Sequence, residues 1–499
     1  MTNNYQQTIL SSEQIRQKMA ELLAQTNVET INQQRRELME KKLQEYHEFA
    51  DSLSAAQSYQ GHNKAQDPDL KEVSHVLSPK DNIEQLDHQH KKYIQSKLPG
   101  QWLVILTFSL SSMLLPFCID MYLSAFPKMA NEYQVGLSDI EFSLSIYFIG
   151  IALGQLLFGP LADAIGRKGI TCVAYALLAV SSAIIANIDD LMALYTLRFI
   201  QGFFCAAIIV TSTSILRDIY ETVDFVRING IITLIFFAAP FLAPLIGSYI
   251  AVLSSWHYIF YSIGALSLVC LALFMKLIPE TINPAFKRKI DFKHTFKTMG
   301  GIIADGRSFW LIMLMSSSSC VIFAYVSMAS GVFQKFYGIS EQVFPYLFMI
   351  NIVTQSLFNI FNTKMVKYLS PQKLLLIGMG WTLMAGLFNV IAPAFGIGFY
   401  GILFGIMLGM SASPLIFLNA IALYLEMHYR HSGTASSLVN ISRWILPGVV
   451  TAIAQRIDPY RGYTMLMVMG IFSLLVVLSY YLYTVCQKRV NHKAANTPA

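Results

Sequence analysis

Charged residues are scarce in this chain, and their scarcity excludes an ordinary soluble protein. Of the 499 residues, 13% are charged and 54% are hydrophobic, and the mean hydropathy is +0.48. A soluble globular chain carries about a quarter charged residues. The deficit begins after Trp102, whereas residues 1–98 are polar. The apolar part is arranged in blocks of about 20 residues, each long enough to cross a hydrocarbon core of about 30 Å, so the sequence predicts a protein that spans a membrane repeatedly.

Cysteine is also sparse, and its spacing argues against a disulfide framework or a metal site. The six cysteines lie mostly inside apolar blocks, so we expect buried thiols and no metal. The chain contains no GxxxxGK[ST] loop, so we expect no nucleotide cofactor and no direct use of ATP. No other enzyme site is visible. The net charge of +6 is modest and predicts no affinity for nucleic acid.

A cleavable signal peptide is a further feature that we do not find. The opening residues, MTNNYQQTILSSEQ, lack the basic start and the apolar core that such a peptide needs. We therefore expect the first spanning helix to act as an uncleaved signal anchor.

The apolar blocks fall into two sets of six. They lie roughly at 101–124, 138–160, 169–187, 190–212, 229–252 and 259–278, and then at 309–330, 344–362, 374–393, 398–423, 434–455 and 462–485. This pattern predicts an all-α transporter of about twelve transmembrane helices built from two halves. We expect a polar N-terminal extension, a first half, a central cytoplasmic loop, a second half and a short tail, at 1–98, 99–279, 280–308, 309–485 and 486–499.

Basic residues predict the orientation, because cytoplasmic loops carry an excess of Lys and Arg. With the extension in the cytoplasm, the connections on that side carry Arg167, Lys168, Arg217, Arg227, Lys287, Arg288, Lys289, Lys293, Lys297, Lys364, Lys367, Lys373 and Arg430. The connections on the opposite side carry Lys128, Lys335, Arg456 and Arg461. We therefore expect both termini in the cytoplasm.

The N-terminal extension has a separate pattern. Residues 11–55 have a helix-forming composition, with apolar residues at intervals of three, four and seven. Two interpretations remain open, a helical contact for a partner protein or a second copy, and a loosely structured surface extension. The residues from Gly61 to about Lys97 read as a linker, because Pro68 and Pro79 interrupt them.

Two charged residues lie inside apolar blocks, where an ionised group costs several kcal/mol. Asp120 stands near the end of the first block, in FCIDMYLSAFP, and Arg198 stands well inside the fourth. Arginine is effectively always protonated. The pair could serve a water-filled site. Alternatively, it is a static ion pair between two helices, or Asp120 lies close enough to the headgroups to stay hydrated.

The most specific motif is GPLADAIGRKG, a short connection between two spanning helices that begins at Gly159. We expect Gly159 to let the helices approach and Gly166 to permit the tight turn. Arg167 and Lys168 would keep the loop in the cytoplasm. Asp163 is then available for a helix N-terminus or for a basic side chain across the bundle.

This order of residues resembles the loop signature of the major facilitator superfamily. LRFIQGFFCAA, with Arg198, Gln201 and Gly202, resembles the fourth-helix motif of that family. FCIDMYLSAFPKMANEY resembles the first-helix signature of the Bcr/CflA-like drug:proton antiporters, and SILRDIY, SSWHYIFY and LIPET fit the same subfamily. The resemblance covers about 100–485.

The resemblance implies a major facilitator fold in a bacterial inner membrane. The implied activity is proton-coupled export of drugs or other small, partly apolar molecules by alternating access. Proton-coupled uptake of a nutrient or siderophore is the alternative. A membrane receptor or scaffold that uses the N-terminal extension is a third interpretation.

The resemblance also implies roles for individual residues. Asp120 and Arg198 would face each other at a central cavity and carry the proton coupling. A cytoplasmic gate would be formed by Gly159, Asp163, Gly166, Arg167 and Lys168. The exporter motif of the fifth helix is kept at Pro240, Pro244 and Gly247, but Ala243 and Ser248 stand where that motif prefers glycine.

Other polar and aromatic residues are candidates for the substrate cavity. Asn351 and Gln355 share one face of a helix, because they are four residues apart, although hydrogen bonding between helices explains them equally well. The candidate cavity residues are Tyr122, Tyr147, Gln201, Phe203, Asn351 and Gln355.

Overall fold

The computed structural model describes residues 90–282, 292–428, 432–457 and 462–495. The predicted contact through residues 11–55 lies outside this part of the chain. Every regular element within the described residues is a helix, and twelve of the helices are long and apolar enough to cross a membrane. The predicted all-α fold with about twelve spanning helices is confirmed.

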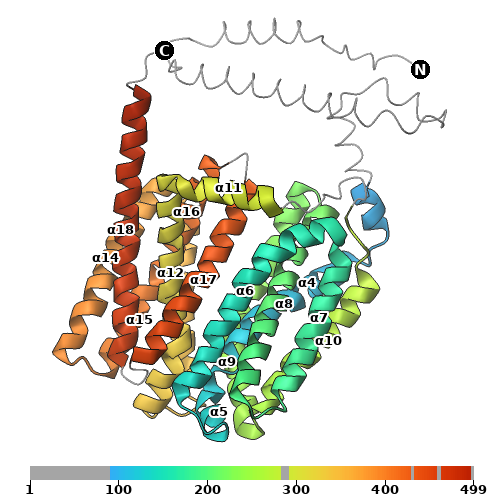
Figure 1. The fold of residues 1–499 in the computed structure, drawn as a ribbon, viewed down its shortest axis with the longest axis horizontal. Coiled ribbons are helices and arrows are strands. Elements are labelled where there is room, and N and C mark those ends of the chain that lie inside the picture. The colour runs from blue at the N-terminus through green and yellow to red at the C-terminus, as the bar shows by residue number, and fades with distance from the viewer. Residues whose placement is uncertain (1–89, 283–291, 429–431, 458–461, 496–499) are drawn as a thin grey trace, which may run out of the picture. The chain divides into compact units, whose positions relative to one another are not determined.

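The first set of spanning helices is coloured blue to green in Figure 1. Its first span, α4 (Gln101–Asp120), continues through the 3₁₀ turn η3 (Leu123–Ala125) into the short helix α5 (Phe126–Glu132). The remaining spans are α6 (Leu137–Ile165), α7 (Arg167–Ile185), α8 (Leu191–Ile219), α9 (Thr222–Leu253) and α10 (His257–Leu277).

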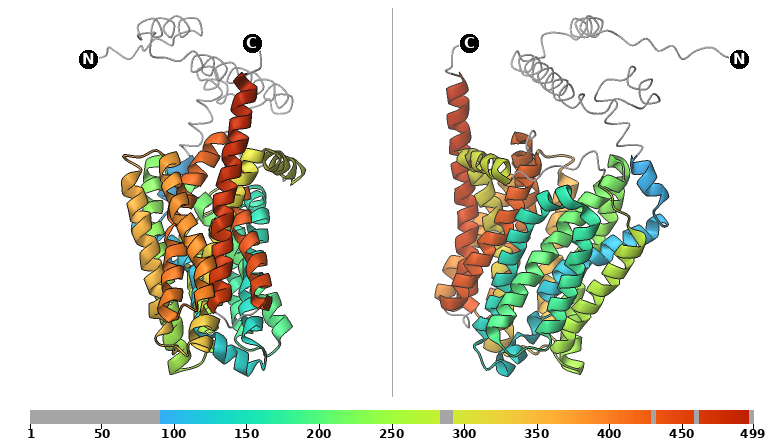
Figure 2. Two further views of the ribbon diagram at one scale, coloured as in Figure 1. Left: turned by 90° about the vertical axis from the view of Figure 1, so that its left-hand side faces the viewer. Right: turned by 45° about the vertical axis from the view of Figure 1, so that its right-hand side comes forward.

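The second set is coloured gold to red in Figure 1. Its first span is α12 (Gly306–Ser330), which continues as the π-helix η5 (Gly331–Phe336). The other spans are α13 (Phe344–Met365), α14 (Pro371–Ile391) with the 3₁₀ turn η6 (Ala392–Phe395), α15 (Phe399–Ser411) joined to α16 (Ser413–Met427), α17 (Ser432–Ile457) and α18 (Gly462–Ala495). Helix α18 runs past the predicted boundary at residue 485, and Figure 2 shows its last turns extending beyond the neighbouring helices.

The central connection, which we predict as a loop, contains the helix α11 (Phe292–Ala304). Met299 and Ile302 are buried on the side that packs on α12 and α17, whereas Phe296 and Ile303 are exposed. Figure 1 shows α11 lying crosswise to the spanning helices. Its apolar residues recur at the helical period between lysines, a pattern typical of helices at a membrane surface. Because the segment is rich in charged residues, its composition alone does not indicate a helix.

Glycine allows α6 and α8 to approach closely. A Cβ atom on Gly150 would overlap the carbonyl oxygen of Phe199, and one on Gly154 would overlap that of Phe203. A Cβ atom on Gly202 of α8 would overlap the carbonyl oxygen of Tyr147 on α6 in the same way. These glycines therefore fix the distance between the two helices that carry most of the candidate site.

The two sets of helices meet along α6 and α17. The hydroxyl of Ser145 on α6 is 2.8 Å from the hydroxyl of Thr451 on α17, and it donates to Gln455 at 3.3 Å. We call the end of the bundle at which α5 connects to α6 the outer end, after the orientation that the basic residues predict.

Gly202→Ala should destabilise the protein by about 1–3 kcal/mol, because an added methyl group forces two close-packed backbones apart. Gly230→Ala on α9 is the matched control, since nothing lies within 4 Å of a Cβ atom there. Denaturant unfolding of the purified protein in detergent measures both. Equal stability of the two variants would contradict the close packing of α6 and α8.

Candidate proton and substrate site

Asp120 lies at a break in the first spanning helix. It is the last residue of α4, and the chain then turns through η3 before continuing as α5. The side chain is 5% exposed and makes no hydrogen bond or ion pair with any described residue. It lies close enough to Tyr325 of α12 for the two groups to interact electrostatically. The carboxyl group therefore faces the second set of helices without a counter-ion.

Tyr325 connects this region to α13. Its hydroxyl accepts a hydrogen bond of 2.9 Å from Nδ2 of Asn351, whose Oδ1 is buried and has no partner among the described residues. The predicted polar face of α13 thus includes one hydrogen bond between helices, at Asn351. Gln355, one turn further on, is half-buried.

Arg198 holds the last turn of α4. The side chain is fully buried on α8, and its Nη2 donates to the carbonyl oxygen of Cys118 at 3.0 Å. Its Nη1 donates to Oε1 of Gln201 at 2.7 Å, and Nε2 of Gln201 donates in turn to the hydroxyl of Ser182 on α7 at 2.7 Å. Carbonyl groups in the last turn of a helix lack partners within that helix. The guanidinium group therefore satisfies a carbonyl and ties α4, α8 and α7 together.

Aromatic rings cover the guanidinium group. Its central carbon lies 4.2 Å from the ring centre of Tyr122 and 4.6 Å from that of Tyr147. A cation over an aromatic face is stabilised electrostatically, more strongly where water is excluded. Tyr122, Tyr147 and Gln201 are fully buried around Arg198. In this conformation these three side chains surround Arg198 and do not line the predicted cavity.

The expected pair of Asp120 and Arg198 is not formed in this structure. Asp120 belongs to the last turn of α4, and Arg198 contacts the same turn, but its guanidinium group donates to the Cys118 carbonyl and to Gln201. Asp120 is thus left without the positive charge that sequence reasoning assigns to it. Phe203, another cavity candidate, packs in an aromatic cluster, with its ring centre 4.8 Å from that of Phe158.

A second buried acid, Glu141 on α6, escaped the sequence analysis. Its side chain is fully buried, and Oε1 accepts a hydrogen bond of 3.1 Å from the backbone N–H of Gly331, the first residue of η5. Its Oε2 has no hydrogen-bond partner among the described residues. The signal was available, because Glu141 lies within the predicted apolar block 138–160.

The loop motif is organised by an acid from the end of the first set. Gly166 has a φ of 132°, which favours glycine. The carboxylate of Glu280, in the LIPET segment, accepts from the backbone N–H groups of Arg167 at 3.0 Å and Lys168 at 3.1 Å. These groups form the N-terminus of α7, where a negative charge is stabilising. A Cβ atom on Gly159 would lie 4.0 Å from Val210, an ordinary contact, so the predicted close approach is not needed there.

Arg167 binds the acids of the same motif region. Its Nη2 lies 3.1 Å from Oδ1 of Asp163, and its Nη1 forms an ion pair with Asp218 on α8. Asp163 therefore interacts within its own half in this conformation. The motif, Asp218 and LIPET are thus linked by hydrogen bonds and ion pairs at one corner of the first set.

The fifth-helix motif brings α9 against the break in α4. Pro240 and Pro244 lie inside α9, and a Cβ atom on Gly247 would overlap the carbonyl oxygen of Met121. The hydroxyl of Ser248 donates to the carbonyl oxygen of Glu341 in the second set at 2.6 Å. The departure from the glycine pattern at Ser248 thus adds a bond between the two halves.

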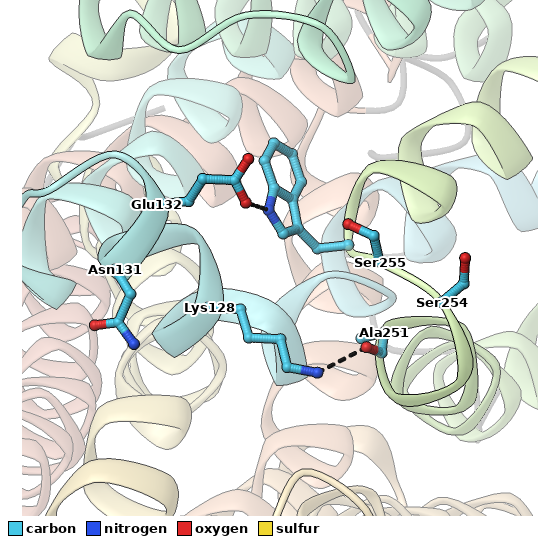
Figure 3. Close-up of a pocket in the computed structure, with 7 residues that line it drawn as sticks. Lys128, Asn131, Glu132, Ala251, Ser254 and Ser255 are labelled. Atoms are coloured by element: carbon cyan, nitrogen blue, oxygen red, sulfur yellow. Dashed lines mark hydrogen bonds between the residues drawn. The ribbon is translucent and has the colours of Figure 1, made fainter.

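A polar cleft of about 440 Å³ opens at the outer end of the first set. Figure 3 shows Lys128 donating to the carbonyl oxygen of Ala251, at 2.7 Å, and Glu132 accepting from the indole N–H of Trp256, at 2.6 Å. Lys128 also lies 2.8 Å from the carboxylate of Glu341, so it links the two sets. The described residues contain no group of three or more His, Cys, Asp and Glu that could hold a metal.

Comparisons with known proteins agree with this architecture. The profile of the Major Facilitator Superfamily matches residues 108–452. The chain is 30% identical to the bicyclomycin resistance protein homolog of Haemophilus influenzae, over 77% of this chain and 96% of that protein. It is 24% identical to the multidrug resistance protein MdtL of Shewanella oneidensis, over 66% of this chain and 82% of that protein.

A crystal structure of the peptide transporter POT in complex with sulfate has the same fold. The TM-score is 0.62 at 15% identity, and the match covers 80% of this chain and 98% of that chain.

Arg198→Lys should cost about 3–5 kcal/mol in stability, because lysine keeps the charge but cannot bind the Cys118 carbonyl and Gln201 together. Arg307→Lys is the matched control, since Arg307 pairs with Asp305 at 3.2 Å in a half-exposed position. Denaturant unfolding of both variants in detergent checks this. A loss at Arg198 no larger than that at Arg307 would mean that the fork is dispensable.

Proposed function

We propose, since this chain belongs to the major facilitator superfamily, that it exports drugs or other small, partly apolar molecules in exchange for protons. The family makes the chain a multi-pass membrane transporter of small molecules and not an enzyme. In our proposal transport proceeds by alternating access, with the two sets of helices opening in turn to either side. Both termini face the cytoplasm of a bacterial cell, and the protein resides in the inner membrane.

Asp120 is the observation that carries the proposal. An acid buried at membrane depth without a counter-ion is costly when ionised. The cost is removed when a proton binds, or when a cationic or hydrogen-bonding substrate approaches the carboxylate. Proton and substrate therefore compete for one group, and such competition is the basis of exchange. Asp120 lies at a helix break and faces Tyr325 of the second set. A rearrangement of the two halves therefore changes the surroundings of the Asp120 carboxyl group.

Arg198 has a supporting role in this proposal. Its charge is fixed and engaged with the Cys118 carbonyl and Gln201, so it does not release a proton. It keeps the last turn of α4 in place and contributes a positive potential near Asp120. We regard it as a positioning residue for the acid.

The contacts between the sets suggest which side is closed. The polar contacts that join them at the outer end include Lys128 with Glu341, Glu141 with Gly331, Ser248 with Glu341, and Asp139 with Arg456. Ser145 on α6 also bonds to Thr451 on α17. By contrast, Asp163 and Arg167 of the loop motif bond within the first set. We interpret the structure as a state that is closed outside and accessible from the cytoplasm.

The direction of transport rests on the relatives. Their names report bicyclomycin and multidrug resistance, which supports export. Inside-out vesicles with an imposed pH gradient test this, with bicyclomycin among the candidate compounds. Proton release on substrate addition, with accumulation inside the vesicles, is the expected result. Proton-driven accumulation in right-side-out vesicles instead would support uptake of a nutrient or siderophore.

Asp120→Asn should abolish transport driven by a pH gradient, because the amide cannot bind and release a proton. Substrate binding or exchange should persist in part, since the amide keeps the volume of a protonated acid. Vesicle transport, with binding measured on the purified protein, separates the two effects.

Asp189→Asn is the matched control for this experiment. Asp189 is exposed in the loop between α7 and α8, so its variant should transport normally. If Asp120→Asn retained full gradient-driven transport, the proton site would lie elsewhere.

Asp163→Asn should impair closure of the cytoplasmic gate that we propose for the loop motif. A cysteine introduced by Gln355→Cys should then react faster with an impermeant maleimide from the cytoplasmic side. Substrate affinity should change little, because Asp163 bonds only to Arg167 among the described residues. Unchanged labelling together with normal transport would reduce the motif to a structural hairpin.

A further inference from the structure

We propose that Glu141 is a second proton-binding site, separate from Asp120, and that a proton bound there from the outside holds the outer end closed. The inference rests on the alternating access in the proposed function. It adds a gating proton that controls the outer opening, whereas the proton on Asp120 is the one exchanged for substrate.

The placement of Glu141 between the halves is the first argument. The side chain extends from α6 of the first set to the backbone N–H of Gly331 in the second set, at 3.1 Å. Gly331 begins the π-helix η5, where α12 departs from regular helical geometry. Single π-turns within helices occur frequently at functional sites. Separation of the two sets at this end must break this bond.

The unequal state of its two oxygens is the second argument. Oε1 has one hydrogen bond, and Oε2 is buried with no partner among the described residues. If the carboxylate were ionised here, Oε2 would have lost its hydrogen bonds to water and gained none from the protein. A neutral carboxyl group keeps the bond to Gly331 and buries no charge. The closed arrangement therefore favours the protonated form, and ionisation favours separation of the halves and hydration of the group.

The surrounding charges do not alter this conclusion. On α6 itself, Asp139 lies 3.6 Å from Arg456 of α17, and the hydroxyl of Tyr195 on α8 donates to the Asp139 carbonyl oxygen. On α5, Lys128 pairs with Glu341. The last turns of α7, SSAII, carry no titratable side chain.

Lys335 of η5 is the charge that acts on Glu141 across the interface. Its positive charge attracts the ionised form, yet Oε2 of Glu141 still has no hydrogen-bond partner among the described residues. Tyr122, near the break in α4, is held by Ser143 at 3.4 Å and by the guanidinium of Arg198. Glu141 is thus, besides Asp120, an acid at this interface that lacks a full set of partners.

The proposed event is a simple protonation. In the outward-open state water reaches Glu141, and the carboxylate takes a proton from the outer solution. The neutral group is then buried against Gly331 as the outer end closes. When that end reopens, the proton returns to the outer solution. This proton does not cross the membrane, so the exchange ratio of protons and substrate is set elsewhere.

The test measures the outer opening directly. Met192 and Tyr400 are exposed at the outer ends of the two sets, at the starts of α8 and α15. Spin labels at Met192→Cys and Tyr400→Cys report their separation by pulsed electron resonance in lipid nanodiscs. The half-buried Cys172 and Cys486 are replaced by serine, and the labelled parent without the new cysteines accounts for the four buried thiols.

A pH titration from about 5 to about 9 covers ordinary and buried carboxyl groups. The unaltered protein should shift toward longer distances as the pH rises. Glu141→Gln imitates the protonated acid, so its short distance should persist across the whole range. Asp189→Asn, which removes one exposed acid at the same end, should respond as the unaltered protein does.

Glu141→Asp provides a second, independent variant. The shorter acid still titrates but reaches less far toward Gly331, so the pH response should remain and its midpoint should move. An unshifted midpoint in this variant, or an unchanged response in Glu141→Gln, would overturn the proposal.

Transport measurements separate this proposal from the proposed function. Glu141→Gln should lower the turnover several-fold and leave the number of protons exchanged per substrate unchanged, whereas Asp120→Asn should abolish gradient-driven transport. Loss of proton exchange in Glu141→Gln would make Glu141 the coupling site and contradict the gating role. If proton exchange depended on Asp120 but the outer end showed no pH response, the gating role of Glu141 would be rejected and the proposed function would stand.

Discussion

The interaction between Arg198 and the carbonyl oxygen of Cys118 is the constraint on which the site depends. The first spanning helix breaks at Asp120, and its last carbonyl groups need partners that its own backbone does not supply. A buried guanidinium provides one, and the rings of Tyr122 and Tyr147 stabilise its charge without neutralising it. A carboxylate in place of these rings would hold the same charge, but it would remove the positive potential near Asp120. The arrangement keeps that acid fixed in position and without a counter-ion.

The seal at the outer end uses a different principle. The halves pack partly through apolar side chains, such as Phe148 against Phe323 and Trp444. Two of the polar contacts between them come from side chains that sequence reasoning either missed or treated as a departure from the motif, Glu141 and Ser248. Each bonds to a backbone group of the other half. Such bonds are directional and are lost together when the halves separate, so they suit an interface that must open and close during each cycle.

The fold was largely predictable, because a membrane restricts the choices. Backbone groups in lipid must be satisfied within each segment, so apolar blocks of sufficient length become helices. The loop motif was predictable for a similar local reason, since Gly166 requires a backbone conformation that other residues disfavour. The helix α11 was missed, because its apolar residues are interleaved with lysines and its burial against α12 and α17 is not visible in composition.

The sequence by itself determined the number of spans and the presence of Asp120 and Arg198 at membrane depth. These follow from periods and from the cost of charge in lipid, which are properties of single segments. Tertiary structure alone decided what each charge faces. The direction of a side chain at a helix break depends on the φ and ψ angles of a few residues, and its partners come from helices distant in sequence. For that reason Arg198 binds the Cys118 carbonyl instead of Asp120, and Glu141 meets Gly331 of the opposite half, because only the packed bundle brings those atoms together.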